Sequence, residues 1–427
     1  FEIKYDGQET AVDYVTMGLT NERQHISVEV VKKDSVTGDP LEGVVFGLYA
    51  EEDIKNAAGE VIVEKDSLIE SGTTDSAGKL TFRADLPHSL YYVKEIENKP
   101  GYLPNDEVYH LDASYTDPTL EVIELSCEVE NQPTITEFTK TDLTGGQEVE
   151  GAKLQILDKD GNVVEEWVSG KEPHTVYALA PGEYVLHEEK APTEQGYVRA
   201  EDVPFIVEET GEVQKVEMKD DHTKVSISKT DITTGEEIEG AKLQILDKDG
   251  NVVEEWVSGK EHLIEYLPTG EYVLHEEQAP TEQGYVRAED VTFVVEETGE
   301  IQKVEMKDDY TKVSISKTDI TDGKEVQGAK LQIFDKDGKV IEEWTSGEEH
   351  LIEYLPTGEY TLHEEAAVDG YIVANDVAFT VKETGEIQKV EMKDERVMGV
   401  LKIHKTDAET GDNLEGVEFT LYEKESG

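Results

Sequence analysis

Hydrophobic and polar residues alternate along the chain over short runs, and no run keeps the three-to-four-residue spacing of an amphipathic helix. The runs are rich in Val, Ile, Tyr and Thr, and turn sequences such as DKDGN, LPTGEY and EETGE separate them. Alternation of this kind is typical of strands with one buried face. The pattern therefore predicts an all-β protein.

The strand pattern recurs along the chain. A KTD sequence places lysines at positions 140, 229, 317 and 405, so successive copies are 89, 88 and 88 residues apart. A divergent copy places Lys32 in the same position and holds about twenty additional residues. Copies of this length with several short strands are typical of small β-sandwiches, so we expect a tandem array joined by linkers of a few residues.

The periodicity divides the chain into four whole repeats and a fragment at each end. The first fragment reads as the C-terminal remnant of a preceding repeat, and the last as the incomplete N-terminal part of a fifth. We therefore expect the chain to be a piece of a longer array. In chain order, the first fragment, repeats 1 to 4 and the last fragment are residues 1–25, 26–132, 133–221, 222–309, 310–395 and 396–427.

Strand alternation places three charged side chains of each repeat on an apolar face. In VSISK, Lys229 shares a face with Val225 and Ile227. By the same rule, Glu276 in EYVLHEE and Asp308 in VEMKDD each share a face with apolar residues. Isolated buried charges are costly, so a trio of them in every repeat needs an explanation.

Burial suggests a chemistry for the trio. It lowers the pKa of a lysine and raises that of a carboxyl group, which gives a nucleophilic neutral amine and a protonated Asp acceptor. A neighbouring Glu can polarise the acceptor and shuttle protons. The product would be a Lys–Asp amide with loss of water, or a Lys–Asn amide with loss of ammonia. A structural salt bridge is the alternative, and the mass of the protein distinguishes the two.

Several motifs resemble one known family. KxD is followed by EGA or EGV, and the LPTGEY turn occurs in repeats 3 and 4. HEEKAPTEQGY, HEEQAPTEQGY and KEIENKPGY occur in repeats 2, 3 and 1. These sequences resemble the Cna B-type (CnaB) or SpaA-like repeat domains of Gram-positive surface adhesins and pilins. The resemblance implies prealbumin-like, Ig-like β-sandwiches that form their own isopeptide bonds. Asn98 stands where the family usually has Ala, and HEEAAVDGY in repeat 4 lacks the usual Pro.

The resemblance assigns a role to each member of the trio. Lys405 has no acceptor in this chain, and Asn21, a candidate acceptor of the preceding repeat, has no lysine upstream at the spacing of the other repeats. The implied bond-forming lysines are Lys32, Lys140, Lys229 and Lys317; the proton shuttles are Glu95, Glu188, Glu276 and Glu364; and the acceptors are Asn131, Asp220, Asp308 and Asp394.

Charge and composition exclude several partners. With 39 Lys and Arg against 98 Asp and Glu, the net charge is −59, which disfavours nucleic acid and anionic lipid surfaces. The sequence contains no run of eighteen apolar residues, so it does not suggest membrane insertion. Cys127 is the single cysteine, which excludes an internal disulfide framework. Export and cell-wall attachment signals are expected outside this chain. The spacing of DKDGN does not fit a calcium loop, so we predict no metal and no cofactor.

Two functions fit these observations. The first is a structural stalk segment of a secreted, cell-wall-anchored surface protein, whose near-identical repeats carry a distal region away from the cell. The alternative is an adhesive module in which the divergent repeat 1 binds a host or matrix protein. No nucleophile, metal cluster or phosphate loop for an external substrate is visible. We therefore expect no enzyme activity other than autocatalytic isopeptide formation.

Overall fold

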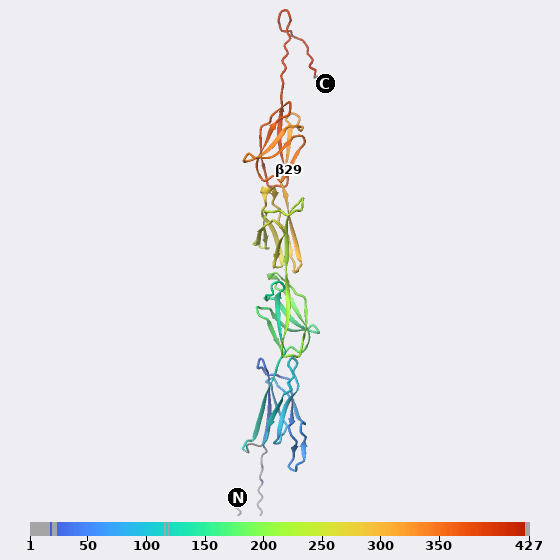
Figure 1. Cartoon of the computed structure of the whole chain (residues 1–427), viewed down its shortest axis with the longest axis vertical. Coiled ribbons are helices and arrows are strands. Elements are labelled where there is room, and N and C mark those ends of the chain that lie inside the picture. The colour runs from blue at the N-terminus through green and yellow to red at the C-terminus, as the bar shows by residue number, and fades with distance from the viewer. Residues whose placement is uncertain (1–17, 19–23, 115–116, 118, 423–427) are drawn as a thin grey trace, which may run out of the picture. The chain divides into compact units, whose positions relative to one another are not determined.

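The computed structural model describes residues 18, 24–114, 117 and 119–422 (Figure 1). Within these residues the regular structure consists of strands β1 to β33 and two 3-10 helices, η1 (Thr193–Gln195) and η2 (Thr281–Gln283). The all-β prediction is confirmed. The chain divides into two compact units at Thr223 and Lys224, and residues 297–299 belong with the first unit.

Repeat 1 contains a three-stranded sheet, a four-stranded sheet and a small hairpin. Their strand orders are β6-β1-β9, β5-β2-β7-β8 and β3-β4. The hairpin lies within the additional residues that distinguish this repeat. The strands are β1 (His25–Asp34), β2 (Val45–Ala50), β3 (Ile54–Lys55), β4 (Val61–Val63), β5 (Leu68–Thr73), β6 (Lys79–Phe82), β7 (Leu90–Glu97), β8 (Val108–Asp112) and β9 (Val122–Asn131).

Repeat 2 contains two four-stranded sheets, with the orders β13-β10-β17-β15 and β12-β11-β14-β16. DKDGN forms the turn of the β11–β12 hairpin, as the sequence predicts. The strands are β10 (Ile135–Asp142), β11 (Lys153–Asp158), β12 (Val163–Val168), β13 (His174–Tyr177), β14 (Gly182–Lys190), β15 (Tyr197–Val198), β16 (Val203–Val207) and β17 (Val213–His222).

Repeats 3 and 4 have the same two-sheet topology as repeat 2. Repeat 3 comprises β18 (Lys224–Asp231), β19 (Lys242–Leu246), β20 (Val252–Val257), β21 (His262–Glu265), β22 (Gly270–Gln278), β23 (Tyr285–Val286), β24 (Val291–Val295) and β25 (Ile301–Tyr310). Repeat 4 comprises β26 (Lys312–Asp319), β27 (Lys330–Asp335), β28 (Val340–Thr345), β29 (His350–Glu353), β30 (Gly358–Ala366), β31 (Tyr371–Ile372), β32 (Val377–Val381) and β33 (Ile387–Arg396).

The first and last strands of each repeat lie side by side and run parallel. In repeat 3, Lys229 on β18 is opposite Met306 on β25, and Asp308 lies two residues further along β25. Because residues two apart share a face, Lys229 and Asp308 both point between the sheets. They lie beside a core that includes Ile227, Leu243 and Leu274, which are at most 1% exposed.

The connections between repeats are shorter than the expected linkers of a few residues. β25 ends at Tyr310 and β26 begins at Lys312, so only Thr311 lies between them, and it is fully buried. β17 and β18 are likewise separated by the buried Thr223 alone. Repeat 1 differs slightly, since residues 132–134 connect β9 to β10. The final strand of one repeat thus leads almost directly into the first strand of the next.

Candidate functional site

The trio of repeat 3 meets in its core. Lys229 Nζ lies 3.0 Å from Glu276 Oε2 and forms a close ion pair with Asp308. These three side chains are at most 1% exposed. Glu276 Oε2 also accepts a hydrogen bond of 2.7 Å from the Ala288 N–H, which fixes the carboxylate beside the amine. Strands β18, β22 and β25 therefore bring together three residues that are far apart in sequence.

Repeats 2 and 4 reproduce this arrangement. Lys140 Nζ lies 3.0 Å from Glu188 Oε2 and pairs closely with Asp220. In repeat 4, Lys317 lies 3.0 Å from Glu364 and pairs with Asp394. The anchoring N–H donors are those of Ala200, at 2.7 Å from Glu188, and of Ala374, at 2.6 Å from Glu364. Loss of the Pro in repeat 4 thus leaves the position of its glutamate unchanged.

The environment favours the protonated form of the acceptor carboxyl groups. Burial raises the pKa of Asp220 and of Asp308 to about 7, although the adjacent lysine acts in the opposite direction. Contact with the neighbouring glutamate raises the pKa further. Burial also raises the pKa of Asp394. Near neutral pH a substantial fraction of the Asp220 and Asp308 carboxyl groups is therefore uncharged.

Each trio of repeats 2 to 4 contains polar atoms without an ordinary hydrogen bond. The second oxygens of the glutamate and of the aspartate are buried and accept no ordinary hydrogen bond from any described residue; in repeat 3 they are Glu276 Oε1 and Asp308 Oδ2. A proton shared between the two carboxyl groups would satisfy one oxygen of each. Unpaired buried oxygens are costly, so this cluster is poorly designed as a permanent salt bridge.

Repeat 1 builds its trio differently. Lys32 Nζ is buried, 3.6 Å from Glu95 Oε2, and burial lowers the pKa of Lys32 to about 8. Asn131 Nδ2 donates to both Glu95 oxygens at 3.0 Å and to Asn98 Oδ1 at 2.8 Å. The unusual Asn98 therefore contacts the acceptor amide directly. Sequence reasoning noted this residue only as a departure from the family.

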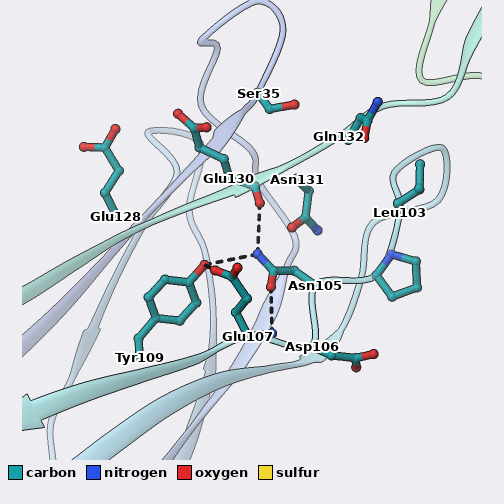
Figure 2. A pocket seen from close by; sticks show the side chains of 11 residues that line it. Ser35, Leu103, Asn105, Asp106, Glu107, Tyr109, Glu128, Glu130, Asn131 and Gln132 are labelled. Atoms are coloured by element: carbon teal, nitrogen blue, oxygen red, sulfur yellow. Dashed lines mark hydrogen bonds between the residues drawn. The ribbon is translucent and has the colours of Figure 1, made fainter. Parts of the chain in front are cut away.

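An open pocket of about 900 Å³ borders the repeat 1 site (Figure 2). Asn131 is in its wall, and Asn105 crosses the pocket, donating to the Glu130 carbonyl at 3.0 Å and to the Tyr109 hydroxyl at 3.1 Å. Its lining includes the carboxylates of Asp106 and Glu128. Within the described residues, however, no group of three or more His, Cys, Asp or Glu side chains is arranged to hold a metal ion.

The Asp of the KxD motif has a structural role that sequence reasoning did not assign. Asp231 is 2% exposed, and its Oδ1 accepts the N–H groups of Thr233 at 2.7 Å and Thr234 at 2.8 Å. Asp34 caps the turn of repeat 1 in the same way. An Asp followed by a turn sequence is the expected signal for such a cap. The Asp of the motif therefore holds the turn that directly follows the strand carrying the lysine.

The remaining predicted residues do not form a site here. Lys405 is exposed, and Asn21 lies outside the described residues. His187, His275 and His363, at equivalent positions in repeats 2 to 4, each pair with an aspartate; His275 Nδ1, for example, lies 2.7 Å from Asp290 Oδ1. No helix in the described part of the chain is long and apolar enough to cross a membrane.

The sequence matches one domain family four times. The SpaA prealbumin-like fold domain matches residues 26–124, 134–222, 223–310 and 311–396. The chain belongs to the SpaA prealbumin-like family. The resemblance inferred from the motifs is thus confirmed. The matched regions of repeats 2 to 4 include their acceptor aspartates, whereas the first matched region ends before Asn131.

Solved structures with chains similar to this one include two pilins. The Bacillus anthracis TIE protein is 21% identical, with 86% of this chain and 73% of that chain covered and a TM-score of 0.39. For the major pilin subunit BcpA of Bacillus cereus, the identity is 13%, the coverage is 88% and 100%, and the TM-score is 0.21. For a streptococcal ancillary pilin these values are 16%, 61% and 98%, and 0.29. Among curated proteins, none matches the sequence.

Proposed function

We propose that the chain is a structural stalk segment of a cell-wall-anchored bacterial surface protein, located outside the cell. Each SpaA prealbumin-like repeat is stabilised by an isopeptide bond that it forms itself. The observation that carries this proposal is the recurrence of one buried Lys, one Glu and one Asp or Asn in contact in all four repeats. A stalk needs repeated domains that stay folded under load, and a covalent bond between first and last strands provides this property.

The proposed reaction in repeats 2 to 4 begins with transfer of a proton from the lysine to the aspartate of the ion pair, which gives a neutral amine and a protonated acid. In repeat 3, Lys229 Nζ attacks Asp308 Cγ, and an N–C bond forms. Glu276 accepts a proton from the nitrogen and delivers it to the departing hydroxyl, which leaves as water. The protonated state of Asp308 that its raised pKa favours makes its carbonyl electrophilic. The amide product is neutral, so the reaction removes two charges from the core.

In repeat 1 the same attack by Lys32 on Asn131 Cγ releases ammonia. Glu95 is placed to move a proton to the departing nitrogen, since both of its oxygens lie 3.0 Å from Asn131 Nδ2. The open pocket beside Asn131 offers ammonia a route to solvent (Figure 2). This route supports the assignment of Asn131 as the acceptor.

The intact mass tests the proposal directly. We expect the denatured chain to be lighter than its sequence by three waters and one ammonia, one molecule for each repeat. Digestion should yield branched peptides that join Lys32 to Asn131 and Lys229 to Asp308. A mass equal to that of the sequence would mean that the four trios form no covalent bond and are salt bridges.

A specific surface of repeat 1 favours adhesion as a second function. On the outer face of its four-stranded sheet, the rings of Tyr49 and Tyr92 stack with centroids 5.0 Å apart. Gly47 leaves room for Leu68 and Ile96 to approach each other, because a Cβ there would lie within 2.9 Å of both. Leu68 is 51% exposed and Ile96 is 42% exposed. An aromatic and aliphatic patch of this kind is typical of a protein-binding surface.

Binding of the full chain to a panel of matrix proteins tests this second function. Ile96→Asp should abolish any specific binding, because it places a charge in the centre of the patch. Ile206→Asp is the matched control, since Ile206 is 64% exposed on β16 of repeat 2. Equal effects of the two substitutions would remove repeat 1 as the binding module.

A further inference from the structure

Thr311, the residue between β25 and β26, forms hydrogen bonds with both repeat 3 and repeat 4. The Thr311 N–H donates to the Gly284 carbonyl at 2.8 Å, and the Thr311 carbonyl accepts from the Tyr354 N–H at 3.0 Å. Its hydroxyl donates to the Leu355 carbonyl at 2.6 Å. Gly284 lies in the loop before β23 of repeat 3, whereas Tyr354 and Leu355 follow β29 of repeat 4. Because its polar groups are all paired, Thr311 is held in place rather than acting as a hinge.

Tyr354 of repeat 4 inserts its side chain among residues of repeat 3, which in the structure includes Tyr310, the last residue of β25. Its ring stacks on Tyr310 with centroids 4.0 Å apart and meets Tyr285 edge-on at 5.6 Å. Its hydroxyl donates to Asp231 Oδ2 at 2.8 Å. Tyr354 has a φ of 58°, in the left-handed region that non-glycine residues rarely occupy. Such strain persists only where surrounding contacts hold the residue, and here the ring contacts do so.

Gly284 allows the two repeats to approach closely. It has a φ of 82°, and a Cβ at this position would overlap the backbone of Tyr354. Any other residue would push the Tyr354 backbone away. A further hydrogen bond, from the Thr357 N–H to the Thr281 carbonyl at 3.2 Å, lies beside this contact.

The joint between repeats 1 and 2 has the same backbone design without the tyrosine. The Thr134 N–H donates to the Gly101 carbonyl at 2.8 Å, and the Thr134 carbonyl accepts from the Ala178 N–H at 2.9 Å. Ala178 also has a left-handed φ, 59°, and packs against the core of repeat 1. A Cβ on Gly101 would overlap the Ala178 carbonyl group. The glycine–threonine joint is therefore a shared device, and Tyr354 adds an aromatic contact to it.

We propose that Gly284, Tyr285, Tyr310 and Asp231 form a docking socket for the following copy of the repeat, which Tyr354 fills. Repeats 3 and 4 are then coupled, so that opening the joint exposes the N–H groups of Thr311, Tyr354 and Thr357, which the contacts with repeat 3 and the connecting residue protect. The partner that the socket fits is a second SpaA prealbumin-like domain with a tyrosine at the end of its fourth strand. This coupling goes beyond the stalk proposal and does not depend on isopeptide formation.

Hydrogen exchange of the full chain tests the socket, with two matched glycines as the comparison. Gly284→Ala adds a Cβ that clashes with Tyr354, so exchange at Thr311, Tyr354 and Thr357 should accelerate about tenfold or more. Gly370→Ala is the control in repeat 4. Gly370 has a φ of 92°, but no heavy atom of the residues that the structure describes lies within 4 Å of the added Cβ. It therefore reports the cost of backbone strain alone.

A second variant keeps the test decisive if Gly284→Ala unfolds repeat 3. Tyr354→Ala retains the residue type found at Ala178 and removes the ring, so it should accelerate exchange at Thr357 while exchange in the cores of repeats 3 and 4 stays unchanged. Tyr360→Phe, which removes a hydroxyl bonded to Pro356 within repeat 4, should leave exchange at Thr357 unchanged. Unchanged exchange at Thr357 in Tyr354→Ala, or equal effects of the two glycine substitutions, would overturn the socket.

Discussion

Repeat 1 and repeats 2 to 4 place a lysine and a glutamate in the same positions of one fold, yet they surround different acceptors. Asp308 is an acid that burial keeps partly protonated, whereas Asn131 is a neutral amide held by Glu95 and Asn98. The reactivity of an acid acceptor depends on its own pKa, whereas an amide acceptor needs a proton donor for its leaving nitrogen. Under the proposed reaction, the same scaffold supports either acceptor if the loop after the glutamate strand changes with it.

The largest effect should follow removal of the lysine in either type of repeat. Lys229→Ala and Lys32→Ala should each leave one bond unformed, so the intact mass should rise relative to the expected crosslinked mass by one water or one ammonia. Closing so long a loop stabilises a fold by roughly 4 to 5 kcal/mol if the chain-entropy treatment of disulfides applies to an amide. The altered repeat should melt separately from the others in calorimetry.

Single-molecule pulling provides the mechanical version of this comparison. The intact array should show no unfolding step of domain size, whereas Lys229→Ala should release one step, from repeat 3 alone. Lys405→Ala is the control, because Lys405 is exposed in this chain. Domain-sized steps in the unaltered protein would contradict the proposed clamp in both types of repeat.

Removal of the glutamate should separate catalysis from folding. Glu276→Ala should leave repeat 3 folded but without its bond, because proton transfer and packing are different roles. Glu95→Ala should do the same in repeat 1, although Asn98 still holds the amide. Circular dichroism monitors the fold, and peptide mapping monitors the bond. If Glu276→Ala still loses its water, Glu276 has no part in the reaction.

The two acceptor types should respond differently to pH during bond formation. In repeats 2 and 3 the reaction needs both a neutral lysine and a protonated aspartate, so the rate should stop rising and level off above about pH 7, where the aspartate loses its proton. In repeat 1 the amide needs no proton but Lys32 must lose one, so the rate should rise as pH passes through about 8. Refolding of chains isolated unfolded, followed by peptide mapping over time, measures both rates.

Asn131→Asp sharpens this comparison, because it gives repeat 1 the acceptor of the others. Its crosslinked product should have the same mass as the unaltered protein, since loss of water from Lys and Asp yields the same amide as loss of ammonia from Lys and Asn. Because the new carboxyl group loses its proton as pH rises while Lys32 must still lose one, its rate should level off instead of rising through about pH 8. A variant that keeps the rising profile would show that the acceptor does not set the pH dependence.

The smallest effect should follow Asn98→Ala, which restores the usual family residue. It removes one acceptor from Asn131 Nδ2 but leaves both Glu95 oxygens in place. One hydrogen bond is worth about 1 kcal/mol, so the bond in repeat 1 should form a few times more slowly. Rates in repeats 2 to 4 serve as the internal control. An unchanged rate in repeat 1 would assign Asn98 a packing role only.

Strand periodicity predicts much of the site and little of what surrounds it. Lys229 and Glu276 follow from alternation, because a period of two determines which face a side chain occupies whatever the rest of the fold does. The contact between Tyr354 and Asp231 does not follow, since it depends on how one repeat meets the next. Asn98 could be recognised as unusual, but its contact with Asn131 requires the loop conformation.

The buried threonine between repeats has a consequence for proteolysis. Proteases cleave exposed, extended segments, and the boundaries between domains are usually where such segments occur. At Thr311 the backbone N–H and carbonyl are both engaged and the residue has no exposed surface, so a protease cannot bind the chain there without first separating two domains. A surface protein built this way would lose its distal part to host or bacterial proteases only after a domain opens.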